Sequence, residues 1–529
     1  MLNKQIDIQD VQGWIARLLV LMIFFAQPLY FNSARYSGLT YHKFVFFVVY
    51  MCIILVFILI VWLYRLTRKP RLIPRGRFSV TDWAILGFAA VMLISALLSP
   101  YKSFEVVWWN VWLGMESRYD GAITQLLYVA VYFIVSRWYR LREKDFILFA
   151  ASAILVALIG IFQFYGMDFF GLWETHPYKR GYSADNYFGI WVRTTIGNVN
   201  FVSTYVCVAV LLCGFLFVRR DYKWRYVWLA GGAFSFWMMI IAGSYSGMVG
   251  TLAAMVLALP FIIQNKKYLG RFLILASSLT AIFTVQRLLY NTLILGAGTA
   301  SGLIILAALM CALLAAGIAL NKAGKTHESD GSVKWKMGVI LIGVCLVFGL
   351  AGVEILGRSE NAGPVYQARE ILRGNAQDDF GSHRIHIWRN VLRAFPQHLL
   401  LGGGPDSLIF VYPTDQQMVI GGLVDKAHNE YLQILICQGI LGLLCYLIFI
   451  GGVFFKGIKK AVQYPIHMAV LAAFTGYCVQ AFFNISLPII GQLLWVFAGL
   501  LASRPPPLTA SENATLSENT PLLENILTG

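Results

Sequence analysis

Apolar and polar positions divide the chain into long hydrophobic runs separated by shorter polar segments. Fourteen of these runs have the length and composition of membrane helices, which need roughly 20 apolar residues to cross the ~30 Å hydrocarbon core of a bilayer. The pattern therefore predicts an all-α polytopic membrane protein with about 14 transmembrane helices. The runs lie near residues 14–31, 43–64, 82–99, 123–137, 146–165, 201–218, 226–242, 247–264, 271–288, 299–320, 337–356, 431–455, 466–485 and 487–502.

Four regions follow from this pattern. Residues 1–356 hold helices 1–11 and two outer loops, at 100–122 and 167–200. A long extracytoplasmic segment spans 357–430, helices 12–14 occupy 431–502, and 503–529 form a cytoplasmic tail. The tail is rich in Pro, Ser, Thr and Asn, a composition that predicts disorder. No credible cleavage site follows the first run, so we expect it to be retained as a span.

Composition and charge agree with a membrane protein. The chain of 529 residues is 58% hydrophobic and 13% charged, against about 25% charged residues in soluble domains. Its net charge of +16 does not point to nucleic acid, because the Lys and Arg residues concentrate in six short loops. With both termini in the cytoplasm, all six loops lie on the cytoplasmic side, as membrane insertion favours. They are residues 65–77, 137–144, 219–225, 266–271, 321–336 and 456–460.

The sequence predicts neither a metal nor a cofactor. All eight cysteines fall inside predicted spans, without the spacing of metal ligands. The histidines of the outer segments form no convincing helical pair with an acidic partner. The three glycines at 402–404 precede a proline and follow no strand, so we interpret them as a hinge and not as a nucleotide-binding loop.

The segment "SHRIHIWRNVLRAF" (382–395) predicts an amphipathic helix on the outer membrane surface. Arg384 precedes Trp388 by one turn, and Arg389 belongs to the polar stripe. The outer segments together gather many arginines, whose planar guanidinium groups bind phosphate oxygens in pairs. We therefore expect a lipid-linked phosphate or diphosphate here. The arginines are Arg118, Arg193, Arg358, Arg369, Arg373, Arg384, Arg389 and Arg393.

His428 is the candidate general base. It precedes an apolar run of membrane length, on the predicted outer side. Its ordinary pKa of ~6.5 leaves it largely neutral at pH 7 and able to accept a proton from a hydroxyl. A capping or interfacial role is the alternative. The adjacent Asn429 and the arginine-rich segment favour the catalytic interpretation.

Two further outer elements carry candidate binding groups. Asn198 and Asn200 in "TTIGNVNFVSTY" (194–205) suit sugar or phosphate binding, and capping of the following helix is equally compatible with them. Asp120 in "ESRYDG" (116–121) would hold an acceptor or orient Arg118, and a plain ion pair in a turn is the alternative.

These motifs resemble those of the O-antigen ligase and O-antigen polymerase superfamily of membrane glycosyltransferases. The resemblance rests on "GSHRIHIW", "FPQHLLLGGGPDS", "AHNEYLQILICQGILG" and "TIGNVNF", while "RYDG" and "GIFQFYGMD" resemble a Gram-positive subgroup. It implies metal-independent, inverting transfer of a glycan from an undecaprenyl-diphosphate carrier to an acceptor hydroxyl outside the bacterial cytoplasmic membrane. Arg384 would contact the diphosphate, and His428 would activate the acceptor.

One position departs from the family pattern. The turn "GSYSG" (243–247) has Tyr245 where many members have arginine. Either Arg193 or Arg389 compensates, or donor affinity is lower, or the activity differs.

Several functions remain open from the sequence. A chain polymerase and a protein oligosaccharyltransferase share the donor chemistry of a ligase, so the acceptor, whether glycan, lipid or protein, is not determined. A metal-dependent glycosyltransferase would use Glu116 and Asp120. A transporter of lipid-linked glycans would need polar groups along a path through the membrane, and the predicted spans contain few. Membrane lipids are the remaining expected partners.

Overall fold

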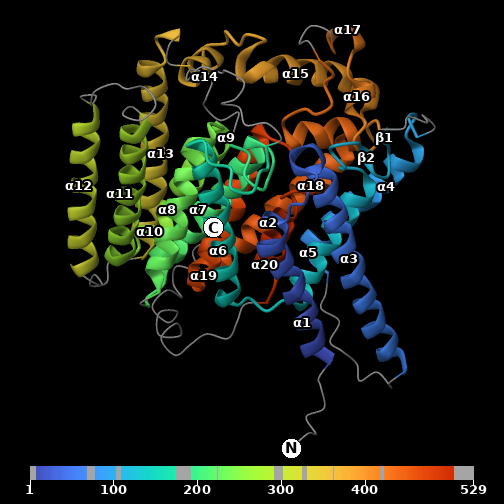
Figure 1. Cartoon of the computed structure of the whole chain (residues 1–529), viewed down its shortest axis with the longest axis horizontal. Helices are drawn as coiled ribbons and strands as arrows, with labels where there is room; N and C mark the ends of the chain where they lie inside the picture. Colours follow the sequence, from blue (N-terminus) through green and yellow to red (C-terminus); the bar gives the residue numbers. More distant parts are fainter. Residues whose placement is uncertain are drawn as a thin grey trace, which may run out of the picture.

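The computed structural model describes residues 8–67, 78–102, 109–173, 192–222, 224–290, 302–323, 331–360, 363–417 and 422–504. Helices dominate these residues (Figure 1). Within the described ranges the only strands are β1 (Trp109–Asn110) and β2 (Gly114–Met115), which pair antiparallel with Trp109 opposite Met115. The prediction of an all-α membrane protein is therefore confirmed.

Each of the fourteen predicted runs overlaps a helix, but the helices fall into two groups. In the described part of the chain, eleven are long and apolar enough to cross a membrane. The first of these combines α1 (Ile8–Leu21), the π-helix η1 (Met22–Ala26) and α2 (Gln27–Leu29). The others are α3 (Arg35–Thr67), α4 (Val80–Leu98), α6 (Glu143–Phe164), α7 (Val199–Arg219), α8 (Arg225–Ala242), α11 (Lys266–Leu289), α12 (Gly302–Ala323), α13 (Gly331–Leu356), α18 (Glu430–Gln463) and α19 (Pro465–Gln480).

Three of the predicted spans form helices of only 10–17 residues. They are α5 (Ala122–Trp138), α9 (Tyr245–Leu257) and α20 (Gln492–Ala502). The apolar run that contains α9 is interrupted at Pro260, which lies in the separate helix α10 (Leu259–Ile262). Proline lacks the N–H that would continue the helix, so this run does not form one long span.

The remaining helices lie across one end of the bundle. In Figure 1, α14 (Pro364–Leu372) and α15 (Phe380–Ala394) cover the tips of the upright helices, and α16 (Leu408–Val411) and α17 (Thr414–Gln417) lie beside them. The 3-10 helices η6 (Phe395–His398) and η8 (Ala481–Phe483) follow α15 and α19. The predicted outer segment thus has helical structure of its own.

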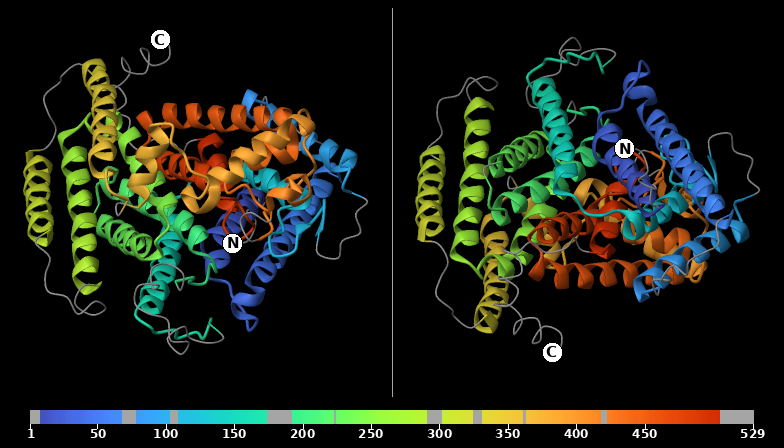
Figure 2. Two further views of the ribbon diagram at one scale, coloured as in Figure 1. Left: turned by 90° about the horizontal axis from the view of Figure 1, so that it is seen from above. Right: turned by 90° about the horizontal axis from the view of Figure 1, so that it is seen from below.

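The centre of the bundle is α7, which is enclosed by α8, α9, α11 and α19. All of its residues from Phe201 to Val218 are buried. A helix that is hydrophobic all round is typical of such a central position. Beyond α11, the helices α12 and α13 stand to one side (Figures 1 and 2). The most apolar window of α13 has no buried residue, so this helix presents its apolar surface to the lipid.

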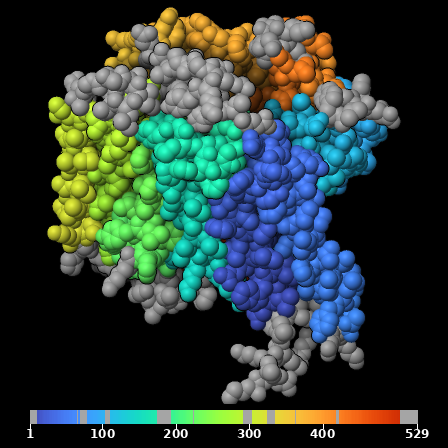
Figure 3. All heavy atoms as spheres, in the orientation of Figure 1, coloured from blue at the N-terminus to red at the C-terminus, as the bar shows by residue number. Residues whose placement is uncertain are grey.

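The ion pairs lie mainly at the two ends of the helix bundle. At the end away from α14 and α15, ion pairs join the basic residues of the predicted cytoplasmic loops to acidic neighbours. They include Arg220–Glu143 at 2.6 Å, Arg137–Asp82 at 2.9 Å and Lys267–Asp221 at 2.7 Å. Figure 3 shows the lower part of α3 extending past its neighbours at this end.

The helix predicted over 382–395 is present, but its start and its buried face differ from the prediction. The first residues of α15, Gly381–His383, have left-handed backbone angles, and the regular helix runs from Arg384. Its buried face consists of His386, Ile387, Asn390, Val391 and Ala394, whereas Leu392 is 51% exposed. The apolar residues of this buried face form a cluster with Leu408, Tyr412 and Val424. The helix therefore packs against other parts of the protein instead of only lying on the membrane.

Candidate functional site

The candidate site is built around the residues that lead into α18. Asn429 is the N-cap of this helix, and its side-chain oxygen accepts hydrogen bonds from the backbone N–H groups of Tyr431 and Leu432 at 3.0 and 3.1 Å. Such a cap satisfies N–H groups that have no partner within the helix. The Asn429 side chain therefore has a structural role here, and its predicted contact with substrate stays a prediction.

Lys426 ties three parts of the chain together beneath this helix start. Its ammonium lies 2.8 Å from the carboxylate of Asp120 and 2.6 Å from that of Asp406, and all three side chains are buried. Asp406 also accepts a hydrogen bond from the Met115 backbone N–H at 2.7 Å. The first outer loop, the glycine-rich segment and the residues before α18 are thereby joined by one ionic cluster.

The cluster contains one ammonium group and two carboxylates, so its charges do not balance when all three groups are ionised. Burial lowers the pKa of Lys426, but the two neighbouring carboxylates outweigh burial and the net effect raises it. Burial raises the pKa of Asp120 to about 7, although Lys426 opposes this shift. Of the options that the sequence left open for Asp120, the structure shows an ion pair, with Lys426 and not with Arg118.

Ala427, between Lys426 and His428, is fixed by two hydrogen bonds. The Ala427 carbonyl accepts a hydrogen bond from the Trp388 indole N–H at 2.9 Å, and the Ala427 N–H donates to the Gln433 side chain at 2.8 Å. Trp388 itself packs edge-on against Phe482 at 5.4 Å between ring centroids. The predicted substrate-binding residue Trp388 thus positions the segment that carries His428.

His428 has an unusual backbone and an unfilled hydrogen-bonding position. Its φ of +49° lies in the left-handed region that non-glycine residues seldom adopt. Within the described residues, its Nδ1 atom is buried without a hydrogen-bond partner. Burial lowers the pKa of His428 to about 4, and the positive charge of Arg384 acts in the same direction. The imidazole is therefore neutral at pH 7.

Arg384 lies close enough to His428 for its positive charge to lower the pKa of the imidazole. The left-handed turn Gly381–His383 places it at the start of the regular part of α15, and its Nη1 donates to the Gly381 carbonyl at 2.6 Å. Burial lowers the pKa of Arg384 from its ordinary value. In the described ranges no carboxylate forms an ion pair with it, and its Nε is buried without a partner. This guanidinium is available for an anionic ligand.

A second arginine also affects His428, but it is already paired. Arg118 lies 2.5 Å from the Asp425 carboxylate, and its side chain keeps 33% of its exposure. Its positive charge contributes to the lowered pKa of His428, while Asp425 acts in the opposite direction. Two guanidinium groups from separate segments therefore lie near the imidazole.

The glycine-rich segment 399–404 inserts into a break in α18. Gly439 has φ +70° and ψ −174°, which interrupts the helix. The N–H groups of Gly403 and Gly404 donate to the carbonyls of Ile436 and Cys437 at 3.0 and 2.9 Å, and the Ile440 N–H donates to the Leu399 carbonyl at 2.8 Å. Irregular backbone in a membrane protein needs such partners. The glycines predicted to be a hinge are therefore a close-packed backbone contact.

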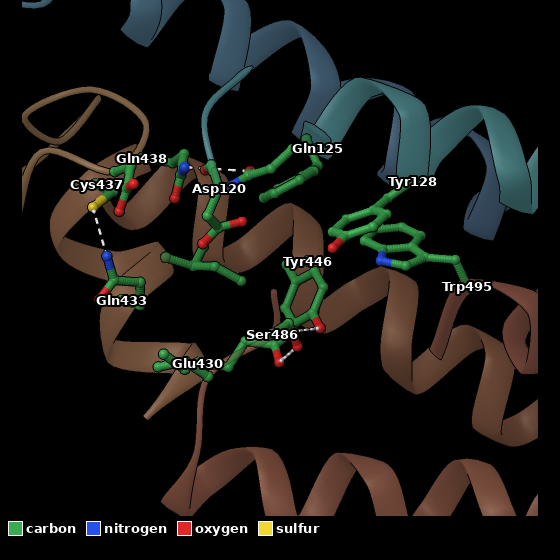
Figure 4. Close-up of a pocket in the computed structure, with 14 residues that line it drawn as sticks. Asp120, Gln125, Tyr128, Glu430, Gln433, Cys437, Gln438, Tyr446, Ser486 and Trp495 are labelled. Atoms are coloured by element: carbon green, nitrogen blue, oxygen red, sulfur yellow. Dashed lines mark hydrogen bonds between the residues drawn. The ribbon is translucent and has the colours of Figure 1, made fainter. Parts of the chain in front are cut away.

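A partly open cavity adjoins the Lys426 cluster, and Asp120 and Asp406 are among the residues that line it. Figure 4 shows Asp120, Glu430, Tyr128 and Tyr446 around the same space. Glu430 accepts hydrogen bonds from the hydroxyls of Tyr446 and Ser486. Among the described residues, the hydroxyl of Tyr128 is buried without a partner, so water is a suitable occupant of this polar cavity.

The other predicted binding residues lie at the same end but make contacts of their own. Asn198 caps α7 by accepting from the Asn200 N–H at 2.9 Å. The Asn200 side chain accepts from the Ser244 hydroxyl at 2.9 Å, next to Tyr245, which is 57% exposed at the start of α9. The backbone of Asn200 also accepts from Asn484 at 2.9 Å.

Two predicted arginines are engaged elsewhere. The Arg193 guanidinium lies 4.7 Å from the Trp173 ring centroid and 5.7 Å from that of Tyr36. Arg389 is 59% exposed and pairs with Asp378. Both contacts leave the substrate role of these arginines a prediction.

Three buried acidic or basic groups of the site had no role in the sequence-based prediction. They are Lys426, Asp406 and Glu430. A signal was present, because each is a polar residue next to apolar sequence, where burial without a partner is costly. Asp120, which pairs with Lys426, and Met115, which donates to Asp406, lie 306 and 291 residues away, whereas Glu430 accepts from Tyr446 and Ser486, 16 and 56 residues away. The sequence alone does not indicate these contacts.

Comparison with known proteins bears on the part of the chain that contains α15 and the start of α18. No curated protein matches the chain. The family model described as O-antigen ligase matches residues 288–447, a region that includes Arg384, Trp388, His428 and Asn429. This match confirms the resemblance drawn from the motifs and supports membership of the chain in the O-antigen ligase superfamily.

Proposed function

We propose that the protein transfers a glycan from an undecaprenyl-diphosphate carrier to an acceptor hydroxyl at the α14–α15 end of the membrane. The observation that carries this proposal is the pairing of a neutral His428 with Arg384, whose guanidinium has no carboxylate partner among the described residues. One group accepts protons and the other binds anions, and glycan transfer from a diphosphate donor needs both.

Arg384 acts on the donor. When the bond between the sugar carbon and the phosphate oxygen breaks, negative charge develops on the diphosphate. A fixed guanidinium lowers the energy of that charge, and it does so more effectively in a partly buried site than in water. Arg118 contributes a second positive charge, which is already partly balanced by Asp425.

His428 acts on the acceptor. Its neutral imidazole accepts the hydroxyl proton while the acceptor oxygen forms a bond to the sugar carbon. The diphosphate leaves from the opposite side, so a single displacement inverts the configuration at that carbon. The imidazolium that forms is disfavoured by burial and by Arg384, which favours rapid loss of the proton to water.

This chemistry requires no metal. Asp120, which a metal-dependent mechanism would use as a ligand, already forms a buried ion pair with Lys426 at 2.8 Å. We therefore propose that transfer continues in EDTA. The sugar composition of the donor and the identity of the acceptor, whether lipid, growing glycan or protein, remain open in this proposal.

The orientation belongs to the same proposal. The loops rich in Lys and Arg lie at the end away from α14 and α15, and such loops favour the cytoplasmic side. We place His428 and Arg384 on the outer face of the bacterial cytoplasmic membrane and both termini in the cytoplasm. A prenyl-anchored donor in the outer leaflet can then reach the site.

Reconstituted protein with a lipid-diphosphate-linked glycan tests the proposal. We expect His428→Ala and Arg384→Ala each to abolish transfer while the folded protein is retained. Arg393→Ala is the matched control, because this exposed arginine lies on α15 in the same helix as Arg384. Full turnover in either site variant would contradict its assigned role. Movement of the donor across the bilayer without a new glycosidic bond would instead indicate a transporter.

A further inference from the structure

The cavity beside the Lys426 cluster holds more negative than positive charge. Asp120 and Asp406 share the single ammonium of Lys426. Glu430 lines the same cavity, is 8% exposed, and in the described part of the chain forms no ion pair with a basic residue. Three carboxylates and one ammonium leave two negative charges when all four groups are ionised. Burying a charge without a partner is costly, so this cavity needs a counter-ion or bound protons.

The carboxylates of Asp120 and Glu430 are close enough to affect each other. Burial raises the pKa of Asp120, and the negative charges of Asp406 and Glu430 raise it further. The two oxygens of Glu430 accept hydrogen bonds from the hydroxyls of Tyr446 and Ser486. These donors hold the Glu430 carboxylate in place at the cavity wall but bring no positive charge to it.

Two neutral oxygen atoms of the cavity also lack a partner. Tyr128 and Gln438 are 2% and 1% exposed, and among the described residues neither the Tyr128 hydroxyl nor the Gln438 Oε1 atom forms a hydrogen bond. In Figure 4 the Tyr128 hydroxyl points into the space between the carboxylates. The amide of Gln438 is oriented by its neighbour, because its Nε2 donates to the Gln125 side-chain oxygen at 3.4 Å. Its own oxygen is therefore left for a ligand.

A small cation suits this combination of groups. Hard cations prefer oxygen ligands, and the cavity offers carboxylate, hydroxyl and amide oxygens. The space in which the centre of a water molecule fits is ≈ 40 Å³, and about 10–15 Å³ suffices for one water. An ion with one or two waters fits, whereas a sugar does not. The Lys426 ammonium, 2.8 Å from Asp120, repels a divalent ion more strongly than a monovalent one.

We propose that this cavity binds one monovalent alkali cation between Asp120 and Glu430, with the Tyr128 hydroxyl and the Gln438 amide oxygen as neutral ligands. The ion offsets part of the excess negative charge and joins the first outer loop, α5 and the first turn of α18. It takes no part in the proposed transfer chemistry, so the activity expected in EDTA, which binds alkali ions poorly, is unaffected.

Binding of radioactive sodium to the purified full-length protein tests this site, with N-methyl-D-glucamine chloride keeping the ionic strength constant. We expect saturable binding of one sodium ion per protein, displaced by unlabelled sodium chloride. The thermal midpoint should rise with sodium until the site is full, since a ligand of the folded state stabilises it. If protons alone balance the carboxylates, no saturable binding appears and the midpoint is the same in both salts, which would overturn the proposal.

The neutral ligand has a conservative test. Tyr128→Phe removes one oxygen atom and should lower the affinity for sodium about tenfold, the effect of losing one polar contact to a charged group. Tyr50→Phe is the matched control and should bind sodium like the natural protein. The Tyr50 hydroxyl is also buried without a partner among the described residues, but Tyr50 does not line the cavity. Equal affinities of the two variants would overturn the assignment.

The charged ligand is tested by Glu430→Gln, which keeps the size of the side chain and removes its charge. Saturable sodium binding should disappear, and unchanged binding would contradict the proposal. Displacement of sodium by calcium chloride at a lower concentration than by sodium chloride would overturn the preference for a monovalent ion. None of these measurements uses glycan transfer, so their outcome is independent of the proposed function.

Discussion

At the scale of single residues, the site depends on how its charges are placed. His428 is neutral at pH 7 because burial, and then the charge of Arg384, lower its pKa to about 4. If His428 is the general base, the acid limb of kcat/KM against pH, which reports the free enzyme, lies near 4 and not near 6.5. Activity should therefore be constant from about pH 6 to pH 8.

Arg384→Gln tests this electrostatic link. Removing the guanidinium removes a positive charge that disfavours the imidazolium, so the pKa of His428 rises and the acid limb moves to higher pH. Unlike alanine, glutamine keeps an N–H donor toward the diphosphate, so we expect slow but measurable transfer, and the measurement is the pH profile of its kcat/KM, whose shape is independent of the loss in rate. Arg393→Gln should keep the original profile. An unchanged acid limb in Arg384→Gln would show that His428 does not set it.

Lys426 gives a second prediction at this scale. Lys426→Met would leave Asp120 and Asp406 buried without their cation, and the loss of one partner of a buried pair costs about 3–5 kcal/mol. We expect a corresponding fall in thermal stability in detergent. Lys459→Met is the control, because Lys459 is exposed near the far end of α18, the helix that follows Lys426. The double variant K426M/D120N should recover part of the loss, and no recovery would argue against the ion pair as the cause.

At the scale of elements, the break in α18 determines where its first turn lies. The segment 399–404 supplies hydrogen bonds to both sides of the break, so the position of His428 relative to Arg384 depends on this contact. At Gly439, an added Cβ would overlap the carbonyl of Leu400, and the φ of +70° is unfavourable for alanine. Both the steric overlap and the unfavourable φ therefore oppose any side chain at position 439.

Gly439→Ala should therefore lower stability and abolish transfer. Gly451→Ala is a close control, since Gly451 lies on the same helix with open space around its Cβ position. Alanine there should be neutral or stabilising by up to about 1 kcal/mol, because glycine is the poorer helix former. The thermal midpoint and the transfer rate of both variants decide the comparison. Equal behaviour of the two would contradict the role of the break.

At the scale of the whole molecule, the sequence predicted much of the architecture and part of the site. The apolar runs located the helices because a membrane helix is defined by its own composition. The motif around Arg384 and His428 was recognisable for a similar reason: it consists of short stretches with a characteristic local pattern. The insertion of 399–404 into α18 and the contact of Lys426 with Asp120 were not predictable, because both depend on how separate segments pack against one another, which no local pattern specifies.

The sidedness of the bundle gives the last prediction. If the α14–α15 end faces the exterior, a membrane-impermeant maleimide added to intact cells should label Gln397→Cys, an exposed position just after α15. Lys459→Cys, exposed at the opposite end, should react only after the membrane is opened. The eight natural cysteines are replaced first so that they do not contribute. Labelling of Lys459→Cys alone in intact cells would place His428 and Arg384 in the cytoplasm, where an outer-leaflet donor is out of reach, and the proposed transfer would then be wrong even if both residues proved essential.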